Sequence, residues 1–197
     1  MRGNTLRGNA LDAQAARAFV RAVEFIEQNY SLPYMRRRLV PQACTTKYTL
    51  TGADAERLKS VEELRYFDGD GAKHRIQQVS PDEIVSNRQG ISRGFEQFSS
   101  TDGGGVMTVE LIFDAPFSPA QDVELQGFFY STVDLSAPGD QSLWLINRAQ
   151  SALMARTMIN LAPVMRDTTV LQMYQALWQE SIGALIGAVS EGEQAGR

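Results

Sequence analysis

The strongest constraint on the fold lies in the last quarter of the chain, where apolar residues recur at helical spacing. From Asp167 or Thr168 onward, one apolar stripe keeps a period of about 3.6 residues: Leu171, Tyr174, Trp178, Ile182, Leu185 and Val189. A second stripe precedes it between an N-cap at Ser142 and Pro163, and alanines at 149, 152 and 155 would let another helix approach closely. The sequence therefore predicts a helical hairpin over 142–189, followed by a polar tail over 190–197.

A further helix is predicted near the N-terminus, over residues 10–30. Asn9 suits the N-cap, and Pro33 should end the helix because it pushes the residue before it towards extended geometry. The apolar face that supports this prediction consists of Phe19, Val23, Ile26 and Tyr30.

The region 36–133 is predicted to be rich in β-strands. In Val106–Phe113 apolar and polar residues alternate, and in Val123–Val133 the residue Gly127 marks a bulge or a close packing contact. The turn Asp68–Gly71 has strong hairpin chemistry. The other expected strands are Arg38–Val40, Lys47–Thr51, Val61–Phe67 and Lys73–Val79.

Two further segments have local signals. Ser80 begins a capping box that predicts a short helix to about Asn87. The segment Ser99–Gly105 is predicted to be an exposed, flexible loop because it is rich in serine and glycine.

The composition fits one globular domain of 197 residues, with 43% apolar and 21% charged residues. A net charge of −4 gives no reason to expect attraction of the whole protein to nucleic acid. One cysteine and one histidine exclude an internal disulfide and His-pair metal motifs. With no transmembrane-length apolar run and no signal-like N-terminus, we expect a protein made in a reducing cytosol, with no membrane partner.

The residues that could take part in catalysis or in ligand binding all have simpler interpretations. Asp68–Gly71 lacks the later ligands of a calcium loop, and Gly103–Gly105 lacks the Lys-Ser/Thr of a phosphate loop. His74 is expected at the surface, and Cys44 as a buried or idle thiol. The adjacent carboxylates Glu62 and Glu63 should point in different directions, so we expect no enzyme and no cofactor.

The basic run of the chain is Arg36, Arg37 and Arg38. It is either a solvated charged segment or a contact with an acidic partner surface or with DNA passing through an assembly. Both interpretations remain open at this point.

The order of several motifs resembles the adaptor (head-to-tail connector) proteins of tailed bacteriophages, which form the ring beneath the portal. The resemblance spans nearly the whole chain, although Thr51–Asp54 lacks the family's turn proline and Phe95–Gly105 lacks its Gly-x-Pro-x-x-Tyr segment. The matching segments are Phe25–Arg38, Tyr48–Leu50, Val79–Ile84, Ile112–Pro116, Phe128–Ser131, Val133–Ser136 and Trp144–Ile146.

The resemblance implies an α+β fold in which the N-terminal helix and two C-terminal helices form a bundle beside a small antiparallel β-sandwich. It implies a structural virion protein of the neck, assembled in the host cytoplasm as a homo-oligomeric ring, usually twelve-fold. Such a ring docks on the portal protein, joins it to a tail or nozzle protein, extends the channel for double-stranded DNA and takes part in genome ejection.

The resemblance also suggests candidate contact residues. The family's C-terminal segment commonly inserts against the portal, which by position gives Ser190, Glu191, Glu193, Gln194 and Arg197. The basic residues Arg36, Arg37 and Arg38 are candidates for an interface or for the DNA channel.

Two other classes of function remain as alternatives. One is another neck or tail component, such as a tail-terminator or head-completion protein, which six-fold rather than twelve-fold symmetry would distinguish. The other is a small hydrolase, which the lack of a nucleophile-plus-histidine signature disfavours.

Overall fold

The structure is a computed structural model that describes residues 3–79, 94–131 and 140–195. The described helices and strands make an α+β protein, as the sequence predicts. Two expectations lie outside these residues: the short helix that begins at Ser80 and the turn Val133–Ser136.

The chain groups into two compact units. One combines both ends of the chain, residues 1–35 and 131–197, and the other holds residues 36–130. The single domain expected from the length stays a prediction.

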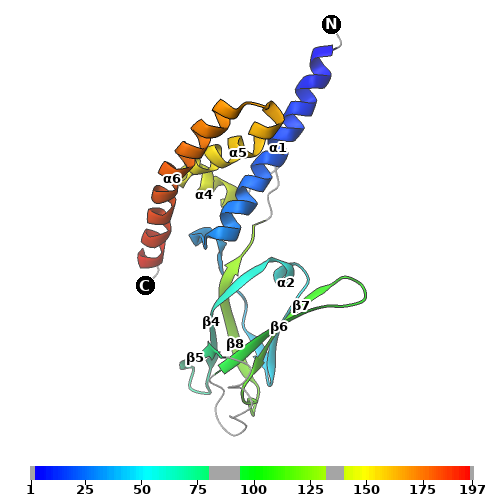
Figure 1. Cartoon of the computed structure of the whole chain (residues 1–197). Helices are drawn as coiled ribbons and strands as arrows, with labels where there is room; N and C mark the ends of the chain where they lie inside the picture. The colour runs from blue at the N-terminus through cyan, green and yellow to red at the C-terminus, as the bar shows by residue number, and fades with distance from the viewer. Residues whose placement is uncertain (1–2, 80–93, 132–139, 196–197) are drawn as a thin grey trace. The chain divides into compact units, whose positions relative to one another are not determined.

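The unit formed by the chain ends is helical (Figure 1). Its helix α5 packs against both α1 and α6. The alanines predicted to allow close approach of a helix, Ala149, Ala152 and Ala155, are buried at 7%, 1% and 0% exposure. The elements are α1 (Gly3–Asn29), the 3-10 turn η1 (Pro33–Met35), α4 (Asp140–Arg148), α5 (Gln150–Met165) and α6 (Thr168–Ala195).

A buried carboxylate joins three parts of this helical unit. Glu27 on α1 is 2% exposed. It accepts a hydrogen bond from the Tyr34 hydroxyl at 2.8 Å and another from the Ser131 backbone N–H at 3.0 Å. Burial, and then the neighbouring Glu27 carboxylate, raise the pKa of Tyr34 well above its usual range. The carboxylate therefore links α1 to η1 and to Ser131, the first residue of the unit's C-terminal segment.

An arginine lies among aromatic rings where α1, α5 and α6 meet. The Arg156 guanidinium carbon is 3.5 Å from the centroid of the Phe25 ring and 6.0 Å from that of Trp178. The two rings pack edge to face at 6.0 Å. Burial lowers the pKa of Arg156. The predicted Trp178 stripe is thus a helix–helix contact.

Three helix boundaries differ from the predictions. α1 begins at Gly3, so Asn9 lies inside the helix; no proline separates residues 3–9 from the amphipathic part. The single helix expected between Ser142 and Pro163 is two helices, because Ala149 has a non-helical backbone between α4 and α5. α5 then passes Pro163 and ends at Met165, where Arg166 is left-handed with φ of 53°.

The last helix also differs at its end. α6 begins at Thr168 as predicted, because the Asp167 carboxylate accepts bonds from the backbone N–H groups of Thr169 and Val170. It continues to Ala195, so most of the predicted tail 190–197 is helical; no proline interrupts it.

The second unit is built on one curled sheet (Figure 1). The strand order is β1-β8-β4-β5-β6-β7-β3, and β2 also pairs with β8. All pairings are antiparallel except that of β5 with β6, which is parallel over two residue pairs. The strands are β1 (Arg36–Arg38), β2 (Gln42–Cys44), β3 (Lys47–Thr51), β4 (Leu58–Phe67), β5 (Lys73–Gln78), β6 (Gly94–Thr101), β7 (Met107–Phe113) and β8 (Gln121–Phe129), with helix α2 (Ala53–Arg57) after β3.

The curled sheet encloses an apolar core. Tyr48, Leu64 and Leu111 come from β3, β4 and β7 and are each 0% exposed. Because these residues are far apart in the sequence, the core depends on strand pairing between distant segments.

The strands match the predictions best where a local signal defines them. Lys47–Thr51 is a strand as predicted, and Asp68–Gly71 is the hairpin turn, in which the Asp68 carboxylate accepts bonds from the Asp70 and Ala72 N–H groups. The expected strand Arg38–Val40 is shifted to Arg36–Arg38, and Val40 is 82% exposed.

The predicted loop Ser99–Gly105 was wrong in its first half. Ser99, Ser100 and Thr101 pair with Val109, Thr108 and Met107 of β7, so they belong to strand β6. Pairing with β7 outweighs the weak strand propensity of this segment.

Gly127 lies in close contact with the backbone of the neighbouring strand β4. A Cβ there would be 2.6 Å from the Ser60 carbonyl oxygen, a distance that real Cβ atoms do not reach. The register between β4 and β8 shifts between Val61 and Glu63, so Glu62 is the extra residue of a bulge beside Gly127. Both interpretations of Gly127, a bulge and a close contact, are confirmed.

We predict that Gly127→Ala lowers the free energy of unfolding by about 2 kcal/mol or more, because the added methyl group meets backbone that cannot rotate away. Chemical denaturation monitored by circular dichroism measures the change.

The matched control is Gly183→Ala in α6, where an added Cβ meets nothing within 4 Å and the residue is exposed. We expect it to raise the free energy of unfolding by about 0.5–1 kcal/mol, since alanine is the better helix former. Equal effects of the two substitutions would show that the contact at Gly127 is not tight.

Candidate functional site

The three arginines of the basic run form strand β1. Arg36 lies opposite Phe128 of β8, and Arg38 opposite Gln126. Because side chains alternate along a strand, Arg36 and Arg38 share one face, and Arg37 lies on the other. Arg36 and Arg38 are exposed, and Arg37 is half-buried.

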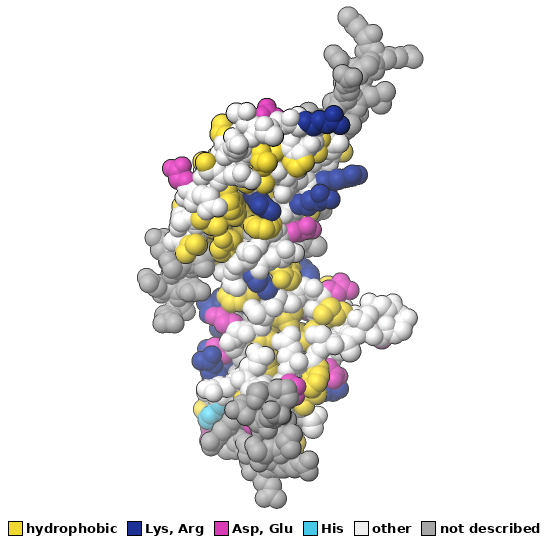
Figure 2. Space-filling view, in the orientation of Figure 1, with side chains coloured by type: hydrophobic (Ala, Val, Ile, Leu, Met, Phe, Trp, Pro, Cys, Tyr) yellow, Lys and Arg dark blue, Asp and Glu magenta, His cyan; other side chains and the backbone are white. Residues whose placement is uncertain are grey.

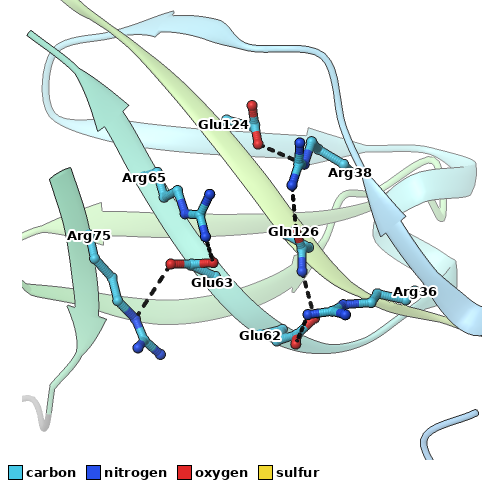
Figure 3. Close-up of polar contacts among 8 residues, drawn as sticks. All are labelled: Arg36, Arg38, Glu62, Glu63, Arg65, Arg75, Glu124 and Gln126. Atoms are coloured by element: carbon cyan, nitrogen blue, oxygen red, sulfur yellow. Dashed lines mark hydrogen bonds and ion pairs between the residues drawn. The ribbon is translucent and has the colours of Figure 1, made fainter. Parts of the chain in front are cut away.

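The bulge in β4 brings a carboxylate to Arg36 (Figure 3). Arg36 Nε donates to Glu62 Oε2 at 2.6 Å, and Arg36 Nη2 donates to Glu62 Oε1 at 2.5 Å. This two-point contact is the strong geometry for an arginine–carboxylate pair. Gln126 donates to the same Glu62 at 2.9 Å, so β1, β4 and β8 are linked by side chains as well as by their backbones.

Arg38 is held by two residues of β8 (Figure 3). Its Nε lies 2.9 Å from Glu124 Oε1, and its Nη2 donates to Gln126 Oε1 at 3.1 Å. Glu124 is 8% exposed, so this pair is less screened by water than an exposed one.

A second group of charges continues across β4 and β5. Arg65 donates to Glu63, and Arg75 Nε lies 3.8 Å from the other Glu63 oxygen. The hydrogen bond from Arg65 keeps the pKa of Glu63 below its usual value, and the same bond raises the pKa of Arg65. A hollow of about 320 Å³ is lined by Glu63, Arg75 and Gln77, among other residues. Its lining therefore carries both a negative and a positive side chain.

The ion pairs of this network leave little net positive charge. They involve four arginines, Arg36, Arg38, Arg65 and Arg75, and three glutamates, Glu62, Glu63 and Glu124, so four minus three leaves one positive charge (Figure 3). Arg37 makes no ion pair with a residue that the structure describes. Of the three candidates, Arg37 is therefore the arginine whose charge remains uncompensated.

The candidate portal-contact residues lie at the other end of the sequence. The structure places Ser190, Glu191, Glu193 and Gln194 in the last turns of α6, while Arg197 lies outside the described residues. These residues belong to the helical unit, whereas the arginines belong to the β unit.

The cysteine and the histidine are both accounted for by local structure. Cys44 is 4% exposed, and burial, with a smaller effect of the Asp122 charge, raises the pKa of its thiol to about 11. His74 Nε2 lies 2.7 Å from Asp68 Oδ2 in the β4–β5 hairpin, and its ring stacks on Tyr66. Within residues 3–79, 94–131 and 140–195, no cluster of histidine, cysteine and carboxylate side chains could hold a metal ion.

No protein-family model matches the chain, and no curated protein matches it significantly. None of the described helices combines the length and apolar character that a membrane crossing requires.

We predict that the Cys44 thiol of the folded protein reacts slowly with a thiol reagent at pH 8 and reacts rapidly after unfolding. The reason is that burial blocks access and the raised pKa keeps the sulfur protonated. The raised pKa means that the folded state binds the thiol proton more tightly than the unfolded state does. At pH values below the ordinary pKa of the thiol, its contribution to the free energy of unfolding is therefore constant. Stability is then lost as the pH rises from that value towards about 11.

The measurement is the absorbance change on reaction with a chromogenic disulfide, with and without denaturant. Equal rates in the two conditions would mean that Cys44 is accessible in the folded protein and is not buried in the core of the β unit.

Proposed function

We propose that this chain is a structural virion protein, an adaptor that docks as a ring beneath the portal of a tailed phage. The proposal rests on the ordered motifs that resemble the adaptor family. One structural observation supports it: the N-terminal helix and the C-terminal helices belong to one compact unit, and the β-rich residues between them form the other. This is the division that the resemblance implies.

The finer fold belongs to the same proposal. The resemblance implies a helical bundle and a small β-sandwich. The packing of α5 against both α1 and α6 is compatible with a bundle of these helices. The short parallel link between β5 and β6 is compatible with two sheet halves that face each other across the core. One half has the order β1-β8-β4-β5, with β2 also paired with β8, and the other has the order β6-β7-β3.

In the proposed ring, the partners are the portal protein, a tail or nozzle protein and other copies of this chain. Ser190, Glu191, Glu193, Gln194 and Arg197 are the candidate portal contacts. Head-to-tail contacts in a ring are heterologous, so each copy needs two different surfaces.

In the proposed ring the chain lies near double-stranded DNA, but two of its three candidate arginines already have carboxylate partners. Arg36 and Arg38 are neutralised by Glu62 and Glu124, which makes them poor phosphate ligands unless those pairs open. Arg37 is the better candidate for a DNA-facing or partner-facing charge.

We predict that purified protein is a monomer or weak oligomer and forms a ring when mixed with the portal of the same phage. Cryo-electron microscopy of the mixture would show an added ring, twelve-fold for an adaptor. Six-fold density would favour a tail-terminator or head-completion protein. The absence of added density would contradict the proposal.

We predict that deleting residues 190–197 weakens portal docking without unfolding the protein. The deletion removes a helix end, which contributes little to global stability because helix termini fray. Co-sedimentation with portal rings measures docking, and thermal unfolding measures stability.

A variant with Glu191→Gln and Glu193→Gln is the control that keeps the helix length while removing two charges. Retained docking by this variant would show that the segment acts through its shape rather than its charge. A collapse of thermal stability on deletion would instead place the segment in the core of the helical unit.

A further inference from the structure

The β6–β7 hairpin extends beyond the strands that flank it (Figure 1). On one side, β5 pairs with β6 only at Gly94 and Phe95. On the other side, β3 pairs with β7 no further than Thr108. The outer part of the hairpin, residues 96–107, forms an arm whose tip, from Thr101 to Met107, extends beyond β3. Along β6 one edge of this arm has no neighbouring strand among the described residues.

The hydrogen bonds near the two ends of β6 fix which residues face that open edge. Asp114 N–H donates to the Gly94 carbonyl at 3.0 Å, and Asp102 N–H donates to the Val106 carbonyl at 3.1 Å. Bonds to one partner recur at every second residue of an antiparallel strand, so the even-numbered residues of β6 bond to β7.

The odd-numbered residues then point their backbone groups outward. Phe95 confirms this parity, because its carbonyl accepts a bond at 3.0 Å from Val79 on the β5 side. Gln97, Ser99 and Thr101 follow with the same orientation, and no backbone bond to them from that side occurs in the described part of the chain. The arm thus presents a row of unpaired N–H and C=O groups.

This edge lacks the usual protections against pairing with another strand. Between Gln97 and Met107 the chain has no lysine, arginine or proline, and the one carboxylate there, Asp102, accepts bonds from Gly104 and Val106 in the turn. In the space-filling view the arm shows little charged surface (Figure 2). Phe98 and Val106, which share the outer face of the hairpin, are 47% and 44% exposed.

We propose that the open edge of β6 binds the same edge of a second copy of this chain, forming a continuous antiparallel sheet across a two-fold axis. Residues whose backbone groups point outward must face one another across the interface, so odd-numbered residues of one copy pair with odd-numbered residues of the other. A register centred on Phe98 meets this rule, because it places Gln97 opposite Ser99 of the second copy and Phe98 opposite its own equivalent.

The edge is self-complementary in this register. Glu96 lies opposite Ser100 of the second copy, so no like charges face each other. The two exposed Phe98 rings meet at a position without backbone bonds, where cross-strand side chains are closest. The pairing stops at Phe95, whose outward carbonyl is already bonded to Val79. This contact is separate from portal docking and is measured on the protein alone, so either proposal can fail without the other.

Amide hydrogen exchange measured by nuclear magnetic resonance over a dilution series tests the proposed geometry. The amides of Phe98 and Ser100 bond to β7 and should be protected at every concentration. The amides of Gln97 and Ser99 should be exposed in dilute protein and become protected as the concentration rises. Protection of Gln97 and Ser99 that does not depend on concentration, or that never appears, would overturn the proposal.

A pair of substitutions at one position gives a second test by analytical ultracentrifugation. Ser99→Pro removes the outward N–H and should weaken dimer formation by about tenfold or more, since each copy loses one bond across the interface. Ser99→Ala keeps that N–H and should dimerise like the natural chain. Equal dimerisation of the two variants, or a natural chain that stays monomeric up to the concentrations used for magnetic resonance, would show that this edge does not bind its own copy.

Should Ser99→Pro fail to fold, Phe98→Ser provides the comparison. This substitution leaves the backbone hydrogen bonds in place and removes the two facing rings. We therefore expect weaker dimerisation, while the odd-numbered amides Gln97 and Ser99 remain the ones whose protection depends on concentration. A Phe98→Ser dimer as stable as that of the natural chain would contradict the register centred on Phe98.

Discussion

The contact between Gly127 and the Ser60 carbonyl is the constraint on which the β unit depends. Strand β8 pairs with β1, β2 and β4, so it carries one whole half of the curled sheet. Only a residue without a Cβ allows β4 to bulge beside β8 at this point. The bulge in turn directs Glu62 towards Arg36. A backbone requirement at one glycine thereby sets the position of a charged side chain on the neighbouring strand.

The electrostatics of the β unit follow from the same strand. β8 supplies Glu124 and Gln126, which hold Arg38, and Gln126 also holds Glu62. An arginine strand that looks like a site for nucleic acid in the sequence is thus largely neutralised in the fold. In the proposed adaptor, a balanced network of this kind suits a rigid part that lies close to DNA without binding it tightly.

The sequence predicted the features that depend on neighbouring residues. The start of the last helix at Asp167 or Thr168, the turn Asp68–Gly71 and the strand Lys47–Thr51 each have a local chemical cause, and each is confirmed. The helical regions and the β-rich region between them followed from hydrophobic periodicity for the same reason. The position of α5 between α1 and α6 is consistent with the predicted alanine stripe.

Other features could not be predicted because they depend on pairing between distant segments. Strand β6 has no regular alternation of its own and becomes a strand through β7. The pairs of Arg36 with Glu62 and of Arg38 with Glu124 depend on the register of β1, β4 and β8, which no local pattern encodes. The end of α6 was placed too early because a polar composition does not by itself stop a helix.

In the proposed assembly, this chain joins a portal to a tail in the phage particle. Cross-linking mass spectrometry of intact phage particles that carry this gene can detect both contacts. We expect cross-links from this chain to the portal protein and to a tail or nozzle protein in the same particles. Absence of the chain from purified particles, or its presence without a cross-link to the portal, would show that the chain is not an adaptor.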